Sequence, residues 1–92
     1  MNFYEKYFNS LKQNIFNYDK SKLNLFVKYL KQTKQNKKKV IIVGNGGSAA
    51  MASHVSVDLT KACKIRSVNF NEADLLTCFA NDYGYENWVK KA

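Results

Sequence analysis

The sequence contains no proline, two cysteines, one histidine and one arginine among its 92 residues. Without proline there is no proline-rich joint, and no low-complexity linker or internal repeat divides the chain. Cys63 and Cys78 show neither the spacing of a metal site nor the pattern of a secreted disulfide framework, so we expect reduced thiols and a cytoplasmic protein. A single arginine, Arg66, excludes recognition of phosphate by several arginine forks.

Long apolar runs are missing as well. No segment approaches the ~20 apolar residues of a membrane span, and residues 1–14 lack the apolar centre of a signal peptide. Acidic side chains are few, 7 against 15 lysines and arginines, which gives a formal net charge of +8. Most lysines are spread over the first forty residues and the last few. We therefore interpret them as a solvated surface and expect no nucleic-acid or membrane partner.

The composition is nevertheless that of a folded protein. Hydrophobic residues make up 46% and aromatic residues 14% of the chain, which is typical of a globular rather than a disordered sequence. A chain of this length forms at most one domain with a modest core. We therefore expect its stability to depend on partners.

The first 36 residues predict a helical arm. Apolar spacing predicts an amphipathic helix over residues 2–17 and a second amphipathic helix that ends near Thr33. A turn separates them, in which Asp19 or Ser21 is available as the N-cap of the second helix. Two apolar-faced helices ahead of one small sheet favour self-association. The apolar residues at helical spacing in the first helix are Phe3, Tyr4, Tyr7, Phe8, Leu11 and Ile15.

A strand, a glycine loop and a helix follow the arm. Residues 40–43 are all β-branched and apolar, which predicts a strand buried on both faces, as in parallel sheets. Residues 44–48 predict a tight turn into a helix over residues 49–61, with Ser48 as its N-cap. Free backbone N–H groups at the positive end of a helix dipole attract an anion, most often a phosphate. The predicted substrate-binding residues of this loop are Gly44, Asn45, Gly46, Gly47 and Ser48.

Two well-known kinds of phosphate-binding loop fit these residues poorly. A nucleotide-binding P-loop needs a lysine before its serine or threonine, and that position is Gly47. A dinucleotide-binding turn matches at Gly44, Gly46 and Ala49 but also requires an acidic residue about 20 positions later. The first acidic residue in that region, Glu72, comes too late. Both alternatives are therefore disfavoured.

The helix over residues 49–61 carries the candidate chemistry. Met51, Val55 and Leu59 recur at four-residue steps and predict its core face, continued by Ala62. His54 and Asp58 are also four residues apart, so their side chains project from one side of the helix. From these residues alone, a surface or partly buried pair is the favoured interpretation.

The last third of the chain predicts a second strand and two helices. Residues 65–70 alternate apolar and polar side chains, as a half-exposed strand would. Asn71 is the predicted N-cap of a helix whose end and following turn are indicated by Asn81 and Asp82. Residues 84–91 predict one more helix. One firm strand and one weaker one predict only the first part of a doubly wound sheet.

From residue 39 onward these motifs resemble the sugar isomerase (SIS) domain, in particular the phosphoheptose isomerases. The first motif is the loop over residues 44–48, followed by His54 and then Asp58-Leu59-Thr60. The second motif is Leu76-Thr77-Cys78-Phe79-Ala80-Asn81-Asp82-Tyr83-Gly84-Tyr85-Glu86.

The resemblance implies an α/β fold. It places an N-terminal helical oligomerisation arm in residues 1–36 and the N-terminal part of a flavodoxin-like doubly wound parallel sheet in residues 37–92. We expect the domain to be truncated, with its remaining strands missing from the chain. The resemblance also implies a homotetramer in which the arms pack between subunits.

The implied activity is isomerisation of sedoheptulose 7-phosphate to a heptose phosphate for envelope or capsule sugars. The reaction moves a proton through an enediol. Asp58 stands where the family has a catalytic glutamate and is the candidate base. His54 matches a histidine that binds zinc in some members, so His54 and Asp58 are candidate zinc ligands, although one histidine is too few for a zinc site by itself. Asn81 and Asp82 match the family's Asn-Asp at the active-site mouth and are candidate substrate-binding residues.

The alternative function is that of a non-catalytic SIS module, resembling the replication-initiator-associating protein, which binds a protein partner on the same scaffold. Aspartate in place of the family's glutamate and the short chain both count toward this alternative.

Overall fold

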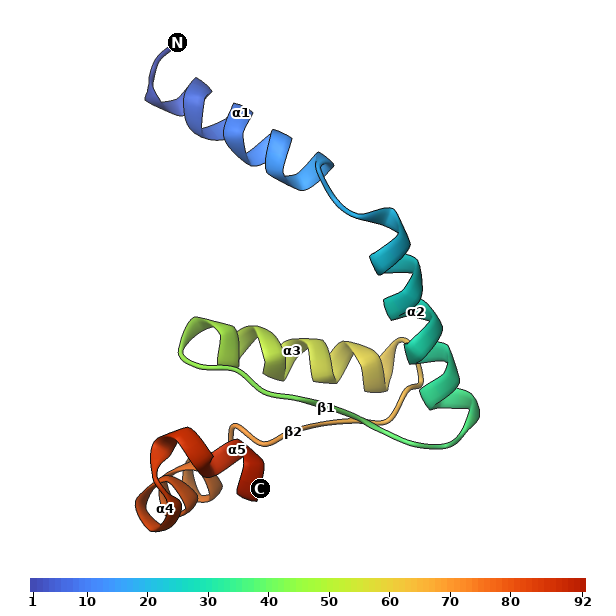
Figure 1. Ribbon diagram of the computed structural model, residues 1–92, viewed down its shortest axis with the longest axis vertical. Coiled ribbons are helices and arrows are strands. Elements are labelled where there is room, and N and C mark those ends of the chain that lie inside the picture. Colours follow the sequence, from blue (N-terminus) through green and yellow to red (C-terminus); the bar gives the residue numbers. More distant parts are fainter.

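The computed structural model describes residues 1–92 as a helical arm, a strand–helix–strand unit and a final group of helices (Figure 1). The predicted α/β class, with an arm ahead of a parallel sheet, is confirmed. The elements in chain order are α1 (Phe3–Phe16), α2 (Lys20–Gln35), β1 (Val40–Ile42), α3 (Gly47–Lys61), β2 (Ser67–Asn69), α4 (Ala73–Tyr83), the 3₁₀ helix η1 (Tyr85–Asn87) and α5 (Trp88–Lys91).

Side-chain caps set the starts of both arm helices. At α1 the Glu5 N–H donates to the Asn2 side chain at 2.9 Å, and the Asn2 N–H donates to the Glu5 carboxylate at 3.2 Å. At α2 the carboxylate of Asp19 accepts from the Ser21 hydroxyl at 2.7 Å and from the Lys22 N–H at 3.2 Å. These hydrogen bonds lower the pKa of Asp19, and the one from Ser21 has the largest effect. Asp19 is therefore the N-cap, and Ser21 supports it.

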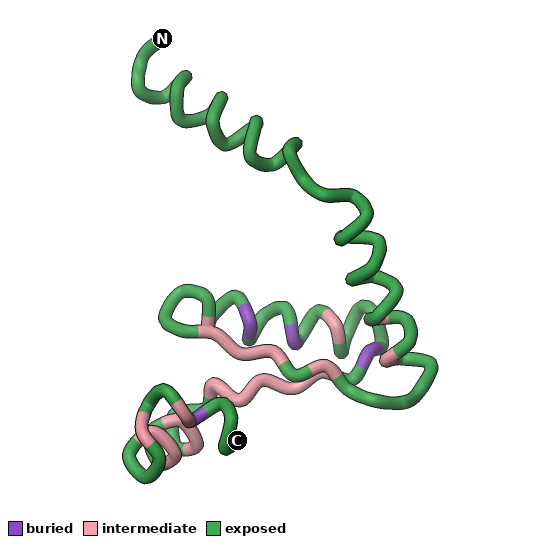
Figure 2. The backbone as a smooth tube through the Cα atoms, in the orientation of Figure 1, coloured by how far each residue is buried: buried purple, intermediate pink, exposed green.

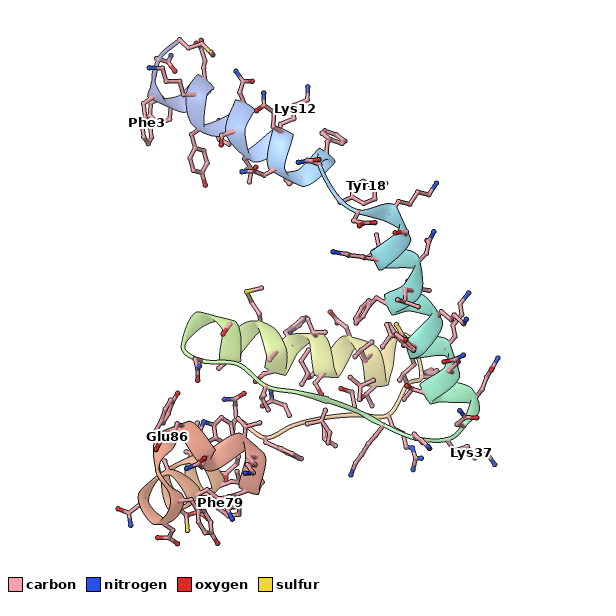
Figure 3. All side chains as sticks on the ribbon, in the orientation of Figure 1. Phe3, Lys12, Tyr18, Lys37, Phe79 and Glu86 are labelled. Carbon is pink, nitrogen blue, oxygen red and sulfur yellow. The ribbon has the colours of Figure 1, made fainter.

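Most of the apolar side of the arm is uncovered within this chain, and Leu30 near the end of α2 is half-buried. Neither α1 nor α2 contains a buried residue, and α1 extends away from the strands (Figures 1 and 2). The side chain of Phe3 at its tip is 73% exposed (Figure 3). The radius of gyration is 17.3 Å, compared with about 12 Å for a compact chain of this length. The predicted arm helices are present, but the chain does not bury them.

The two strands pair in parallel, and α3 packs across both of them (Figure 1). The register places Ile41 opposite Val68 and Ile42 opposite Asn69. The prediction that residues 40–43 are buried on both faces is wrong for this chain, because Ile41 is 51% exposed. α3 is the element that packs against both strands, and it leaves Ile41 more than half exposed.

The face of α3 that meets the sheet also differs from the prediction. Ala52 and Ser56 are its buried residues, whereas Met51 is 69% exposed and Val55 is exposed as well. The helix is thus rotated by about one residue relative to the predicted face. Small side chains on this face let the helix pack close to the two-stranded sheet, whereas larger side chains would increase the distance between helix and sheet.

Only four residues of the chain are buried: Ala52, Ser56, Ile65 and Trp88. Trp88 anchors the last helices, since α5 packs against α4 and η1. None of the helices combines the length and the apolar character needed to cross a lipid bilayer. The core is small, as expected for a chain of this length.

Candidate functional site

The loop over residues 44–48 joins β1 to α3 at the carboxyl end of the sheet, where open parallel sheets bind ligands. Gly46 has φ +54° and ψ −121°, a conformation that side-chain-bearing residues avoid. A Cβ at Gly44 would lie 2.7 Å from the Ala49 nitrogen and closer still to the Ser48 carbonyl group. Gly46 is therefore needed for its backbone angles, and Gly44 for its lack of a side chain.

Ser48 closes the loop rather than capping the helix. The N-cap position belongs to Gly46, so the prediction for Ser48 is wrong. The Ser48 hydroxyl donates to the Asn45 carbonyl at 2.7 Å and accepts from the Asn45 backbone N–H at 2.8 Å. A hydroxyl inside the first helical turn reaches back to the preceding backbone. The single hydroxyl proton of Ser48 is thereby used within the loop.

Three hydrogen-bond donors of the loop stay free. The backbone N–H groups of Gly46 and Gly47 donate to no other group of the chain, and neither does Nδ2 of Asn45. The two N–H groups lie at the start of a 15-residue helix. Unsatisfied N–H groups and the helix dipole together favour an anion at this position.

Two asparagines at the end of β2 hold the loop in place. The Gly44 N–H donates to Asn71 Oδ1 at 2.9 Å, and Asn71 Nδ2 donates back to the Gly44 carbonyl at 2.7 Å. Asn69 Nδ2 donates to the Ile42 carbonyl at 2.8 Å, and Asn69 Oδ1 accepts from the Asn71 N–H at 2.9 Å. The amides thus extend the strand pairing beyond the last paired residues. Sequence reasoning missed this role, although two asparagines at alternate positions of a strand end were a usable signal.

Because Asn71 is engaged with Gly44, it does not cap α4 as predicted. Glu72 is the N-cap: its carboxylate accepts from the Leu75 N–H at 2.9 Å and from the Asp74 N–H at 3.1 Å. These two hydrogen bonds lower the pKa of Glu72, and the one from Leu75 has the largest effect.

Asn81 and Asp82 lie exposed in the last turn of α4, which continues to Tyr83. Asn81 Nδ2 donates to Asp82 Oδ1 at 3.3 Å, and the Cys78 thiol donates to Asp82 Oδ2 at 3.8 Å. The negative charge of Asp82 raises the pKa of the Cys78 thiol. No hydrogen bond joins Asn81 or Asp82 to the glycine loop. The connection is made instead by Tyr85, a residue without an assigned role in the sequence interpretation, whose hydroxyl donates to Asn45 Oδ1 at 2.5 Å.

His54 and Asp58 are brought together, with 3.5 Å between His54 Nε2 and Asp58 Oδ1. Their side chains are 78% and 62% exposed. His54 comes two positions after the sheet-facing Ala52, and Asp58 comes two positions after the sheet-facing Ser56. Two positions correspond to a rotation of about 200° around the helix. The pair therefore points away from the sheet. Along the helix axis, His54 lies about 10 Å and Asp58 about 16 Å from Gly47. A carboxylate in this place is accessible to a substrate, but this chain does not cover it.

The residues present do not by themselves fit a zinc ion. No three histidine, cysteine, aspartate or glutamate side chains are grouped so that they could hold a metal. His54 and Asp58 supply two ligands, whereas catalytic zinc sites use about three protein ligands and a water.

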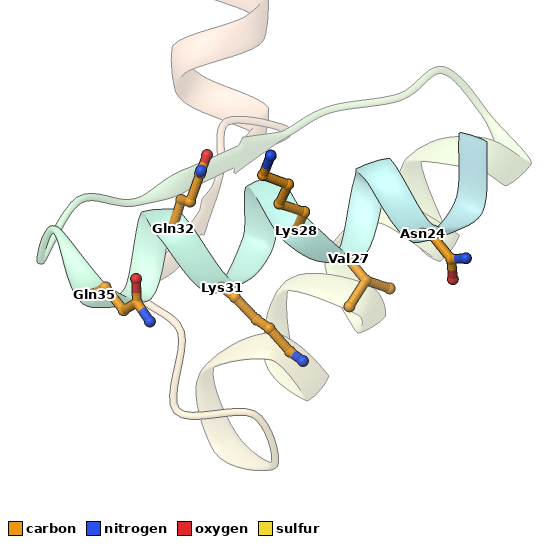
Figure 4. Close-up of a pocket in the computed structure, with 6 residues that line it drawn as sticks. All are labelled: Asn24, Val27, Lys28, Lys31, Gln32 and Gln35. Atoms are coloured by element: carbon orange, nitrogen blue, oxygen red, sulfur yellow. The ribbon is translucent and has the colours of Figure 1, made fainter. Parts of the chain in front are cut away.

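The hollows in the surface lie away from the glycine loop. One of about 480 Å³ is lined by residues of α2 alone, five of the six being polar (Figure 4): Asn24, Val27, Lys28, Lys31, Gln32 and Gln35. Another, of about 280 Å³, is lined by Lys34, Lys37, Lys38, Lys64 and Arg66.

This basic hollow lies where the strands begin, opposite to the loop. Figure 3 shows Lys37 there, and Glu86 at the far side of the molecule. The last turns of α2 and α3 end beside it. Carbonyl groups at helix ends favour cations, which accounts for this cluster without a ligand.

Comparison with known proteins finds similarity to phosphoheptose isomerases. One from Helicobacter pylori is 41% identical over 66 residues, which cover 65% of this chain and 34% of the relative. One from Geotalea daltonii is 35% identical over 72 residues, covering 72% and 38%. One from Campylobacter concisus is 37% identical over 70 residues, covering 70% and 37%. No family model and no solved structure matches the chain.

These matches agree with the SIS-type motifs of the sequence, and the chain spans between 34% and 38% of the length of these relatives. By sequence, the chain is therefore a partial match to the phosphoheptose isomerases.

Proposed function

We propose that the chain carries part of an isomerase site for a phosphorylated sugar, with sedoheptulose 7-phosphate as the substrate and a heptose phosphate for envelope or capsule sugars as the product. One observation supports this most: the glycine loop keeps three free donors in a chain whose relatives are named phosphoheptose isomerases. The donors of Asn45, Gly46 and Gly47 suit a phosphate group. Asn81 and Asp82 are proposed to contact hydroxyl groups of the same sugar.

The proposed reaction moves a proton between adjacent carbon atoms. A base removes the proton next to the carbonyl group, an enediol forms, and the proton returns to the neighbouring carbon. We assign the base to Asp58, because its carboxylate is accessible and lies beside His54. His54 can donate a hydrogen bond that holds this carboxylate in one orientation. Aspartate is one methylene shorter than glutamate, so the substrate must approach the helix more closely than in a glutamate enzyme.

Zinc enters this proposal only for an assembly that supplies more ligands. A zinc ion polarises a carbonyl oxygen, and His54 and Asp58 would be two of its ligands. The remaining ligands must come from residues outside these 92 or from another subunit. No step of the proton transfer depends on the metal.

We further propose that the protein works as an oligomer, a tetramer by resemblance to the family. The accessible surface is 7,673 Å², compared with about 5,500 Å² for a compact monomer of this mass. The excess, on the order of 2,000 Å² for one chain, is more than the about 800 Å² that each partner buries in a standard interface. Most of the large exposed apolar side chains lie on the arm. A cytoplasmic location, also proposed, suits the exposed free thiols of Cys63 and Cys78.

The test is Asp58→Asn in the full-length protein. The amide keeps the shape of the side chain but cannot accept a proton, so turnover of sedoheptulose 7-phosphate should fall by about 10²- to 10⁴-fold. Substrate affinity should stay nearly unchanged. Lys61→Gln, a substitution of an exposed residue on the same helix, is the matched control and should change neither turnover nor substrate affinity.

Three outcomes are informative. Undiminished turnover in the Asp58→Asn variant would remove Asp58 as the base. Substrate binding without any turnover in the unmodified protein would favour the non-catalytic SIS module. Absence of both binding and turnover would reject the phosphosugar site.

A further inference from the structure

Tyr85 reaches the glycine loop from a distant part of the chain. Its hydroxyl donates to Asn45 Oδ1 at 2.5 Å across a separation of 40 residues. This is the only hydrogen bond between residues 81–92 and residues 44–48. Tyr85 begins η1, which packs against α4 and α5. The segment after α4 is therefore joined to the loop by one side-chain hydrogen bond.

In this contact the oxygen of the Asn45 amide is engaged, which leaves the nitrogen end of the amide available. An asparagine side chain has an oxygen that accepts and a nitrogen that donates two hydrogen bonds. Because Oδ1 holds the Tyr85 hydroxyl, both N–H groups of Nδ2 stay free, beside the free N–H groups of Gly46 and Gly47. The opposite orientation would turn an acceptor toward an incoming anion, which repels it.

We propose that Tyr85 is a positioning residue for Asn45 and that its hydroxyl aims the Asn45 amide nitrogen at the phosphate group of the substrate. The proposal rests on the proposed function, because it concerns the same phosphate site. Tyr85 acts through Asn45 and does not itself contact the phosphate.

A purely structural role explains the contact less well. Tyr85 is 53% exposed, so its ring adds little to the core. The neighbouring Trp88 is buried and already anchors this segment. Removal of the Tyr85 hydroxyl alone therefore leaves the packing of η1 and α5 intact.

The first experiment compares Tyr85→Phe with the unmodified full-length protein. Calorimetric titrations use inorganic phosphate and sedoheptulose 7-phosphate as probes. Affinity for both should fall by about threefold to tenfold, the effect of one lost hydrogen bond. The ratio should be the same for both probes, because the missing interaction concerns the phosphate. Without ligand, the NMR signals of the Asn45 side-chain amide should also shift.

Tyr83→Phe is the matched control. Tyr83 is an exposed tyrosine two residues away, and its hydroxyl makes no hydrogen bond within the chain. Its substitution should change neither affinity nor the Asn45 signals. Circular dichroism checks that both variants keep the fold.

A double-mutant cycle separates positioning from stability. In an Asn45→Ala background, Tyr85→Phe should cause no further loss of affinity, because the amide that it orients is gone. Asn45→Asp should bind as weakly as Asn45→Ala or more weakly, since the carboxylate still accepts from Tyr85 but offers no donor.

The outcomes distinguish the two proposals. If the unmodified protein binds both probes and Tyr85→Phe binds them equally well, the positioning role is overturned while the phosphosugar site stands. The positioning role is also overturned if Tyr85→Phe lowers affinity as much in the Asn45→Ala background as in the unmodified protein. If the unmodified protein binds neither probe, the proposed function fails, and the positioning role fails with it.

Discussion

The arm over residues 1–36 and the loop over residues 44–48 are held by different interactions. The arm presents an apolar stripe with no buried residue. Most of it is exposed (Figure 2), and only Leu30 and Thr33 near the end of α2 are half-buried. The loop is bound to the end of β2 by Asn71 and to η1 by Tyr85. One region lacks its partner, whereas the other finds its partners within the same chain.

This difference follows from what each interaction requires. Hydrophobic stabilisation is proportional to the area removed from water, so an apolar stripe needs a second surface of similar size. A loop backbone needs only a few hydrogen bonds with the correct geometry. A two-stranded sheet with one helix can supply the hydrogen bonds but cannot supply the surface. The loop is therefore held by this chain alone, whereas the arm needs a surface that this chain does not supply.

The largest expected effect tests the arm. Leu11→Asp places a charge at the centre of the apolar stripe, and an unpaired charge buried in an interface costs several kcal/mol. The dissociation constant of the proposed oligomer should rise by about 10²-fold or more, as measured by sedimentation velocity over a range of concentrations. Asn9→Asp, on the opposite side of α1, carries the same new charge and should leave association unchanged. Equal behaviour of the two variants would mean that the stripe is not the interface.

A smaller effect is expected at the loop. Gly44→Ala forces a methyl group against the backbone of Ser48 and Ala49, which should lower the free energy of unfolding by about 1–3 kcal/mol. Gly47→Ala is the matched control, because its Cβ meets nothing within 4 Å and its φ is not positive. Urea unfolding measures both variants. Similar losses in both would show that the close approach at Gly44 does not limit the loop.

The smallest effect concerns the last turn of α4. Asp82 raises the pKa of Cys78, so at pH 8 less of this thiol is ionised than in the absence of the carboxylate. Asp82→Asn should lower that pKa and speed alkylation of Cys78 by iodoacetamide at pH 8. The exposed Cys63 is the internal reference, and mass spectrometry reads both sites. The alkylation rates of Cys78 in the variant and in the unmodified protein should become equal at a pH high enough to ionise the thiol fully. An unchanged ratio of the two rates would place Asp82 away from Cys78.

The features predicted correctly from the sequence are those that depend on neighbouring residues. The arm helices follow from apolar residues at helical spacing and from the cap at Asp19. The pairing of His54 with Asp58 follows from their four-residue separation. The roles of Asn71 and Tyr85 could not be predicted, because their partners lie 27 and 40 residues away in the chain.

By itself, the sequence determined the helices, the glycine loop with its free donors and the order of the elements. Only the tertiary structure decided which side of α3 meets the strands. Met51 and Val55 satisfy the helical period as well as Ala52 and Ser56 do, but the narrow sheet admits the smaller pair. The tertiary structure also moved the cap of α4 to Glu72, since Gly44 occupies the side chain of Asn71. Local periodicity allows several faces and caps, and the choice among them depends on the shape and free hydrogen-bonding groups of segments distant in the sequence.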